Sequence, residues 1–462
     1  MITKSELWED WLERTLLTDI TATETPDPVP MIDTSGTELE TTEEFDNYRC
    51  GRGDGQYLYL LYLLDEPAEQ PSNIIPVYIG ETSSITRRLH QHFKKIRAAL
   101  PTDMWEDDGS WGSWSKYDHM AAVYEQAESP LYAWILDVDQ LDAGPYGYPT
   151  YRQELEAKLV GLVHSQPRFE RIFANREFVP NRVIHEMGKV GPKWLTETEG
   201  YEPTSISTSA TVQLAEKSKI DLWHDWVDET ILQDIRDPTA VDPIPLFDTD
   251  EDLRVRTTPE TILKRSETID ARIRHEGNRC VDPDGVPPNC PDGLLYVMYQ
   301  LAPGSGDPEA TDIIPRYIGK AEAYGKKNEL SANFTEIAHD RNRTASFARW
   351  GDGDYWHVGE LSNTVFGKTK KKLAWASELF EQGTPKLNQQ IYLWIRAWDP
   401  EEYRGPYGFD AYLAEAEPLL IGLAQDAYPN SLLNYSRIWK SLQYEPLYSA
   451  AIYRTLSVHQ QS

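Results

Sequence analysis

Residues 59–80, YLLYLLDEPAEQPSNIIPVYIG, return in altered form as residues 296–319, YVMYQLAPGSGDPEATDIIPRYIG. Each copy has two runs rich in aromatic and β-branched residues, separated by a turn-rich segment, which predicts paired strands joined by a long hairpin loop. The copies differ in length only in that segment, where insertions are tolerated because loops lie on the surface. The chain therefore contains a duplicated strand pair.

The duplication continues on both sides of the strand pair. Upstream, ELWEDWLERTLLTDI at 6–20 matches DLWHDWVDETILQDI at 221–235, and the apolar spacing predicts an amphipathic helix in each copy. Downstream, GPYGYPTYRQELEAKLVGL at 144–162 matches GPYGFDAYLAEAEPLLIGL at 405–423, which contains a long helix pattern. We expect two domains, 1–195 and 218–462, joined by a Thr- and Ser-rich linker at 196–217.

The order of elements in each copy predicts the fold class. An N-terminal helix precedes the strand pair, a helix follows the YIG tripeptide, and further strand material leads to the long helix. This pattern predicts an α+β protein in which each repeat has a small, mainly antiparallel sheet flanked by helices.

The composition indicates the environment in which the protein works. The formal charge of -30 comes from 45 Lys and Arg against 75 Asp and Glu, so the overall field repels polyanions. Acidity spread along the whole chain suits concentrated salt, where screening is short-ranged, and we expect a halophilic source. Three cysteines make no disulfide framework, and the start MITKSELWED has no apolar signal region. We expect a cytoplasmic protein without a membrane partner; its oligomeric state is left open.

An ordered set of polar residues runs through the first copy. A tyrosine lies in each strand, a basic helix face follows with an arginine and a histidine at i and i+4, and a helical glutamate and a late asparagine come after it. The six residues are Tyr59, Tyr78, Arg88, His92, Glu156 and Asn175. Each of these residues alone is explained as a packed aromatic or a solvated helix residue. Only their occurrence together, in this order, indicates a functional site.

This order resembles the GIY-YIG nuclease superfamily over residues 57–175, although Tyr57 stands where the first tripeptide usually has glycine. The resemblance implies a metal-dependent DNA endonuclease. Phosphodiester cleavage requires an activated water, a cation for the phosphate and a metal, here Mg²⁺ or Mn²⁺. The tyrosines would position and deprotonate water, Arg88 would clamp the phosphate and Glu156 would bind the metal. His92 would assist proton transfer, and Asn175 would support the site by hydrogen bonding.

Residues 87–97, RRLHQHFKKIR, form the densest basic stretch of this acidic chain. They fall where the substrate phosphates are expected, so this stretch predicts a sequence-independent anchor for nucleic acid. The predicted contact residues are Arg87, Lys94, Lys95 and Arg97. The alternative is a basic helix that balances nearby acids.

The second copy keeps the two tyrosines, the glutamate and the asparagine as Tyr296, Tyr317, Glu417 and Asn434. Matching its Leu330 and Phe334 to Leu89 and Phe93 places Glu329 and Asn333 on a helix at the positions of Arg88 and His92. A carboxylate there would repel a phosphate, so we expect a degenerate site that binds or positions. The lysine-rich run at 367–373 is either a phosphate-contacting loop or a solvated one.

Two further functions stay open beside the DNA endonuclease. One is a catalytically silent module that retains the fold and binds nucleic acid or protein. The other is a nuclease that acts on RNA.

Overall fold

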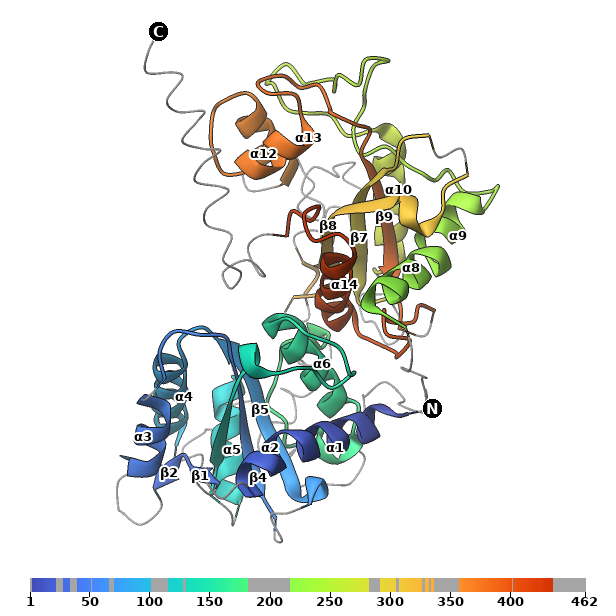
Figure 1. Ribbon diagram of the computed structural model, residues 1–462. Helices are drawn as coiled ribbons and strands as arrows, with labels where there is room; N and C mark the ends of the chain where they lie inside the picture. The colour runs from blue at the N-terminus through green and yellow to red at the C-terminus, as the bar shows by residue number, and fades with distance from the viewer. Residues whose placement is uncertain are drawn as a thin grey trace.

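The computed structural model describes residues 2–21, 28–33, 40–50, 52–65, 70–100, 115–127, 130–181, 217–281, 291–304, 307–325, 329–331, 334–335, 357–400 and 402–434. These residues form an α+β protein with two small antiparallel sheets flanked by helices (Figure 1), as the sequence predicts, and with one further two-stranded ladder. The expected linker at 196–217, apart from its last residue, and Asn333 lie outside the described residues. No helix in the described ranges is both long and apolar enough to cross a bilayer.

The first repeat is built around strand β4. The sheet order is β1-β6-β4-β5, and the predicted strand pair is β4 with β5. Its helices are α1 (Lys4–Arg14), α2 (Leu16–Thr21), α3 (Glu43–Cys50), α4 (Ile85–Ala99), α5 (Lys116–Gln126) and α6 (Arg152–His164); its strands are β1 (Val29–Pro30), β2 (Ile32–Asp33), β3 (Glu40–Thr41), β4 (Tyr57–Leu64), β5 (Ile74–Thr82) and β6 (Tyr132–Asp137).

The second repeat has the equivalent three-stranded core in the order β8-β7-β9. Its helices are α8 (Lys219–Glu229), α9 (Ile231–Arg236), α10 (Glu267–Arg279), α12 (His357–Val365), α13 (Leu373–Leu379) and α14 (Leu413–Ala427); its strands are β7 (Gly293–Leu301), β8 (Ile313–Glu322) and β9 (Tyr392–Trp398). The register shifts between Leu61 and Tyr62 in one repeat and between Met298 and Tyr299 in the other. The duplication thus preserves a β-bulge as well as the strands.

The predicted N-terminal helices form in both repeats, but each is broken after about three turns. The breaks lie at Thr15 and Thr230, whose hydroxyls donate to the carbonyls four residues earlier, on Trp11 and Trp226. A threonine bonded in this way competes with regular helix hydrogen bonding, and a shorter helix follows each break, α2 and α9.

The helix expected after the second YIG tripeptide is wrong at the described residues 323–325 and 329–331. Tyr324 and Leu330 form an antiparallel bridge there, and the Gly325 amide donates to the Glu329 carbonyl at 2.8 Å. Glycine is a poor helix former, which disfavours a helix through Gly325. Glu329 is therefore an exposed turn residue and does not occupy a helical position equivalent to that of Arg88.

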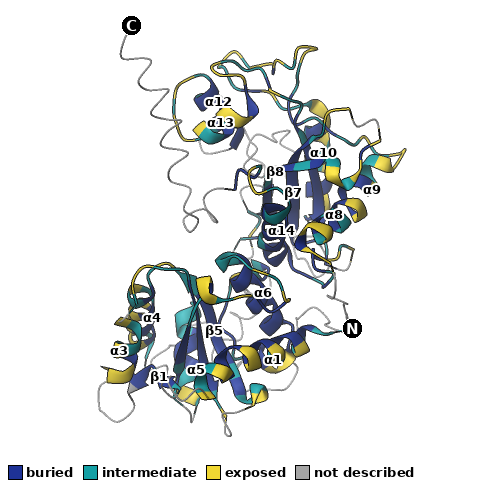
Figure 2. Ribbon diagram, viewed as in Figure 1, coloured by how far each residue is buried: buried dark blue, intermediate teal, exposed yellow. Residues whose placement is uncertain are grey.

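The two repeats meet where α6 and α14 pack together (Figure 1). One hydrophobic cluster runs through both repeats and includes Leu159 and Leu162 of α6 and Leu420 and Leu423 of α14. Every residue of α6 from Glu154 to His164 is buried, as its dark colour in Figure 2 shows. The charged residues of this helix after Arg152 therefore lie inside the protein.

Candidate functional site

Strand pairing brings the two predicted tyrosines of the first repeat together. Tyr59 lies opposite Gly80 in the register of β4 and β5, and its ring centroid is 6.1 Å from that of Tyr78. A Cβ atom at Gly80 would lie 2.2 Å from the Tyr59 hydroxyl oxygen. Only glycine leaves room for that hydroxyl, which gives the last position of the YIG tripeptide a physical reason.

Helix α4 presents Arg88 and His92 to the same tyrosine. The Tyr59 hydroxyl oxygen lies 2.7 Å from His92 Nε2, and Arg88 Nε donates to that oxygen at 3.3 Å. The His92 ring is also 5.0 Å from the Tyr78 ring. The i and i+4 spacing read from the sequence thus places both side chains on the face that covers the tyrosines.

Burial determines the protonation of this group. It lowers the pKa of His92 to about 2, with the fields of Arg88, Lys116 and Lys95 acting in the same direction, so the imidazole is neutral. Since Arg88 donates to Tyr59, we assign the Tyr59 proton to the bond with His92 Nε2. His92 Nδ1 then carries the ring proton, and that buried atom has no hydrogen-bond partner among the described residues. Burial raises the pKa of Tyr59, while Arg88 opposes the rise.

Glu156 lies on the buried side of the site. Burial raises the pKa of its carboxyl to about 8, and the charges of Glu81 and Glu177 raise it further, against Lys116 and Arg88. Its charge in turn raises the pKa of both Tyr59 and Tyr78. A buried carboxyl whose neighbours include two other acids suits a divalent cation that would neutralise it.

Glu156 would supply a single protein ligand to a metal ion. Within the described ranges no group of three or more His, Cys, Asp or Glu side chains gathers around a common point. Mg²⁺ is often bound through one or two carboxylates and several waters, so Glu156 alone fits such an ion.

Asn175 joins the site through the backbone of β5. Its side-chain oxygen accepts from the Ile79 amide and its side-chain nitrogen donates to the Ile79 carbonyl, both at 2.7 Å. Asn434 makes the same pair of bonds to Ile318 in the second repeat. In both repeats the asparagine thus fixes the strand residue that follows the second tyrosine.

Sequence reasoning missed three side chains at the site. Lys116 Nζ donates to the Tyr78 hydroxyl at 2.7 Å and to Glu177 Oε1 at 2.8 Å, and the Tyr117 ring lies 5.5 Å from His92. Lys116 and Tyr117 begin α5, and Glu177 follows Asn175 by two positions. No spacing rule links them to the YIG tripeptide, and only the fold brings them to it.

The four predicted nucleic-acid contacts are exposed on α4. They are Arg87, Lys94, Lys95 and Arg97. Lys95 lies nearest the site, with its ammonium 4.5 Å from the centroid of the Tyr117 ring. The helix thus has a basic outer surface beside the buried tyrosines.

The second repeat preserves part of this arrangement. The Tyr296 and Tyr317 rings are 6.2 Å apart, and a Cβ atom at Gly319 would lie 2.6 Å from the Tyr296 hydroxyl. Two rings lie beside the Tyr317 ring, Trp375 at 5.0 Å and the His357 imidazole at 5.1 Å. Glu417 is buried like Glu156. The second tyrosine of this repeat thus has an aromatic neighbour from α13 and an imidazole from α12.

The lysine-rich run at 367–373 joins α12 to α13. Lys368, Lys370 and Lys371 are exposed. Lys371 Nζ lies 3.5 Å from Glu360 Oε1, and Lys368 donates to the Thr261 hydroxyl at 2.8 Å. Part of the charge of this run is already compensated within the protein.

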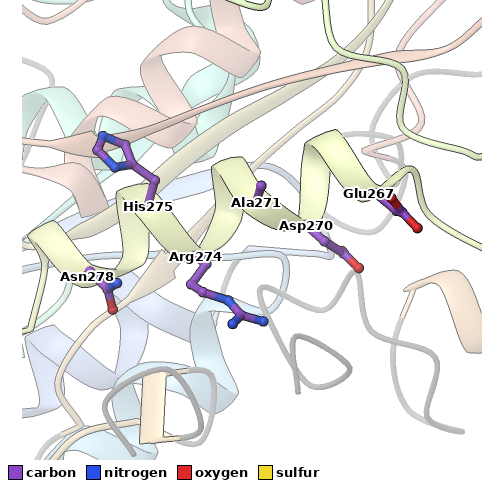
Figure 3. A pocket seen from close by; sticks show the side chains of 6 residues that line it. All are labelled: Glu267, Asp270, Ala271, Arg274, His275 and Asn278. Carbon is purple, nitrogen blue, oxygen red and sulfur yellow. The ribbon is translucent and has the colours of Figure 1, made fainter. Parts of the chain in front are cut away.

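Two surface hollows lie away from the site. One, of about 470 Å³, follows an outer face of α10 and is lined by Glu267, Asp270, Ala271, Arg274, His275 and Asn278 (Figure 3). The other, of about 570 Å³, borders β6 and includes Tyr48, Arg52 and Trp134. Neither contains a residue of the predicted site, whose Tyr59, Tyr78 and His92 are buried.

Comparison with known proteins leaves the chain without a family assignment. No protein-family model matches it, and no curated protein or solved structure is significantly similar to it.

Proposed function

We propose that the first repeat is a metal-dependent endonuclease of the GIY-YIG type that cleaves DNA phosphodiester bonds in the cytoplasm of a halophile. The observation that carries the proposal is the contact of Tyr59 with both His92 and Arg88, beside Tyr78. A hydroxyl that donates to a neutral imidazole can accept a proton from water as it passes its own proton on.

Each side chain then has a defined task. Tyr59 accepts the proton of the attacking water and passes its own proton to His92 Nε2. The negative charge of the bound phosphate would raise the pKa of His92 from its low value, so that Nε2 can take the proton. The Arg88 guanidinium beside the Tyr59 oxygen stabilises the negative charge that develops there and binds a phosphate oxygen. Glu156 would hold Mg²⁺ or Mn²⁺, which when bound polarises the phosphate and assists the leaving oxygen.

The exposed residues of α4 would hold the neighbouring phosphates. Arg87, Lys94, Lys95 and Arg97 provide a local positive surface on a chain of formal charge -30. In concentrated salt such short-range charge matters more than net charge, because screening removes the long-range repulsion. RNA has the same phosphates, so a cleavage assay should include both nucleic acids.

The second repeat would position the first. Its tyrosine pair is retained, whereas Glu329 is an exposed turn residue, an acid where the first repeat has the cation Arg88 in sequence. A carboxylate cannot bind a phosphate oxygen as a guanidinium does. We therefore propose that cleavage belongs to the first repeat and that the second supports it through the shared core.

A silent interaction module is the second candidate function. The observation that favours it is burial: Tyr59, Tyr78 and His92 are each no more than 1% exposed. A nuclease must admit water and a phosphate to these groups, whereas a binding module need not.

The two repeats can be tested against each other. Arg88→Ala is expected to abolish metal-dependent cleavage, and Glu329→Ala to leave it largely intact, as gel assays of plasmid cutting would measure. Cleavage that survives Arg88→Ala would place the active residues elsewhere.

A further inference from the structure

The two tyrosines of the site are held by different partners. Tyr59 contacts His92 and Arg88, whereas the Tyr78 oxygen accepts a hydrogen bond from the Lys116 ammonium at 2.7 Å. We propose that Lys116 is a positioning residue that makes Tyr78 a directed hydrogen-bond donor, and that Glu177 holds Lys116 in place. The inference rests on the proposed function of the site.

The chemistry of an ammonium group fixes the direction of this bond. Lysine has three donors and no acceptor, so the Tyr78 oxygen must accept, and the proton of Tyr78 is free to point to a ligand. The ammonium also lies 4.5 Å from the centroid of the Tyr78 ring, which limits the movement of the ring. Positive charge beside the oxygen makes the hydroxyl a stronger donor to an anionic phosphate oxygen.

Glu177 completes the support of Lys116. Its carboxylate lies 2.8 Å from the Lys116 ammonium. Burial on its own would raise the pKa of Glu177. The positive charge of Lys116 is the largest effect in the opposite direction, and the net result is a lowered pKa. The carboxylate is therefore charged when it holds the ammonium against Tyr78.

The segment that carries Glu177 is anchored in both repeats. Asn175 bonds to Ile79 on one side, and on the other Val179 contacts Tyr412, and Asn181 donates to Glu322 at 2.6 Å. Between these anchors Phe178 has a φ of 68°, a left-handed conformation that is uncommon for a bulky residue. Such a conformation persists where surrounding contacts dictate it. Contacts from both repeats thus fix the position of Glu177.

Lys116 differs from an ordinary surface ion pair in its surroundings. Its side chain is 15% exposed, against 45% for Glu177. An exposed pair contributes little to stability and needs no third partner. Lys116 instead places most of its side chain, and one of its donors, against a buried tyrosine.

Single-turnover cleavage by the full chain tests whether Lys116 acts through Tyr78. Lys116→Met is expected to slow cleavage by about 10- to 100-fold, the range typical of outer-shell residues that orient a group at a metal site. Affinity for the same DNA in Ca²⁺, used as a non-cleaving ion, is expected to change little. In a Tyr78→Phe background the lysine substitution should add almost no further loss, because its target hydroxyl is gone. Independent losses that multiply in the double variant would overturn the proposal.

A second measurement does not depend on cleavage. With tyrosine labelled with ¹³C at Cζ, the Tyr78 resonance is identified by its absence from Tyr78→Phe and the Tyr59 resonance by its absence from Tyr59→Phe. Lys116→Met is expected to move the Tyr78 resonance and to leave that of Tyr59 nearly unchanged. A Tyr78 resonance that stays in place overturns the assignment of Lys116. A shifted Tyr78 resonance in a protein that cuts no nucleic acid supports the contact and rejects the proposed function instead.

Discussion

Lys4 of the first repeat contacts Glu415 of the second, with 3.2 Å between Nζ and Oε1, and both side chains are buried. The same pair occurs with the repeats exchanged, where Lys219 Nζ lies 3.0 Å from Glu154 Oε2. Each lysine also donates to a backbone carbonyl of the other repeat, on Asp410 and on Pro149. The repeats therefore join through a pseudo-twofold interface, as two subunits of a homodimer do.

Loss of one of these lysines is expected to destabilise the protein. Lys4→Met leaves the buried Glu415 without its cation and should cost about 3–5 kcal/mol of the free energy of unfolding. Lys219→Met should cost less, because Lys158 Nζ remains 2.8 Å from Glu154 Oε1. Urea denaturation measures both values. The exposed pair of Arg14 and Asp10 provides the control, and Arg14→Ala should cost only about 0.3–0.5 kcal/mol. Equal small losses for all three variants would contradict the interface.

Gly80 is expected to tolerate no side chain. Its added methyl group would collide with the Tyr59 hydroxyl, which must then move away from His92. Gly80→Ala should cost about 1–3 kcal/mol of stability, as overpacking does, and should remove cleavage. Gly53 is the matched control, because nothing lies within 4 Å of a Cβ atom there. Full cleavage by Gly80→Ala would show that the contact between Tyr59 and His92 is dispensable.

Glu156 is expected to lower stability as it ionises. Its folded pKa of about 8 lies above the ordinary value of 4.5, so its stabilising contribution is complete below 4.5 and lost as pH rises through 8. Glu156→Gln should therefore raise the melting temperature above pH 8 and change it little near pH 4. Each unit of pKa shift corresponds to about 1.4 kcal/mol.

Thermal melts at the two pH values, without divalent ions, make this comparison. Glu13→Gln, at an exposed position of α1, controls for the change in net charge. A Glu156→Gln variant that is no more stable than the wild type at pH 9 would place Glu156 in a more solvated environment than the structure gives it.

Local patterns predicted the strand pairs, the N-terminal helices and the long helices, because each depends on residues close together in sequence. The same spacing put Arg88 and His92 on one helix face. Lys116 could not be predicted as a site residue, because its contact with Tyr78 joins residues 38 positions apart through the fold. The helix expected around Glu329 is wrong because Leu330 pairs with Tyr324 in an antiparallel bridge, despite the apolar match to the first repeat.

The burial of charged residues in the long helices could not be predicted from local sequence patterns either. Glu154, Glu156 and Lys158 look like a surface string in ELEAK, yet all three are buried. Glu154 and Lys158 pair with each other at i and i+4, but the other partners of Glu154, Lys219 and Tyr407, come from the second repeat at separations that no local pattern contains. The Lys4 and Glu415 pair spans 411 positions.

Nicking of supercoiled plasmid DNA by the purified full chain tests the central claim most directly. The assay uses Mg²⁺ or Mn²⁺ at low and at multimolar KCl, with Glu156→Gln alongside the wild type. The account predicts cutting by the wild type that requires the divalent ion and disappears in the variant. Undiminished cutting by Glu156→Gln, or no cutting at either salt concentration by protein shown to be folded, would contradict it.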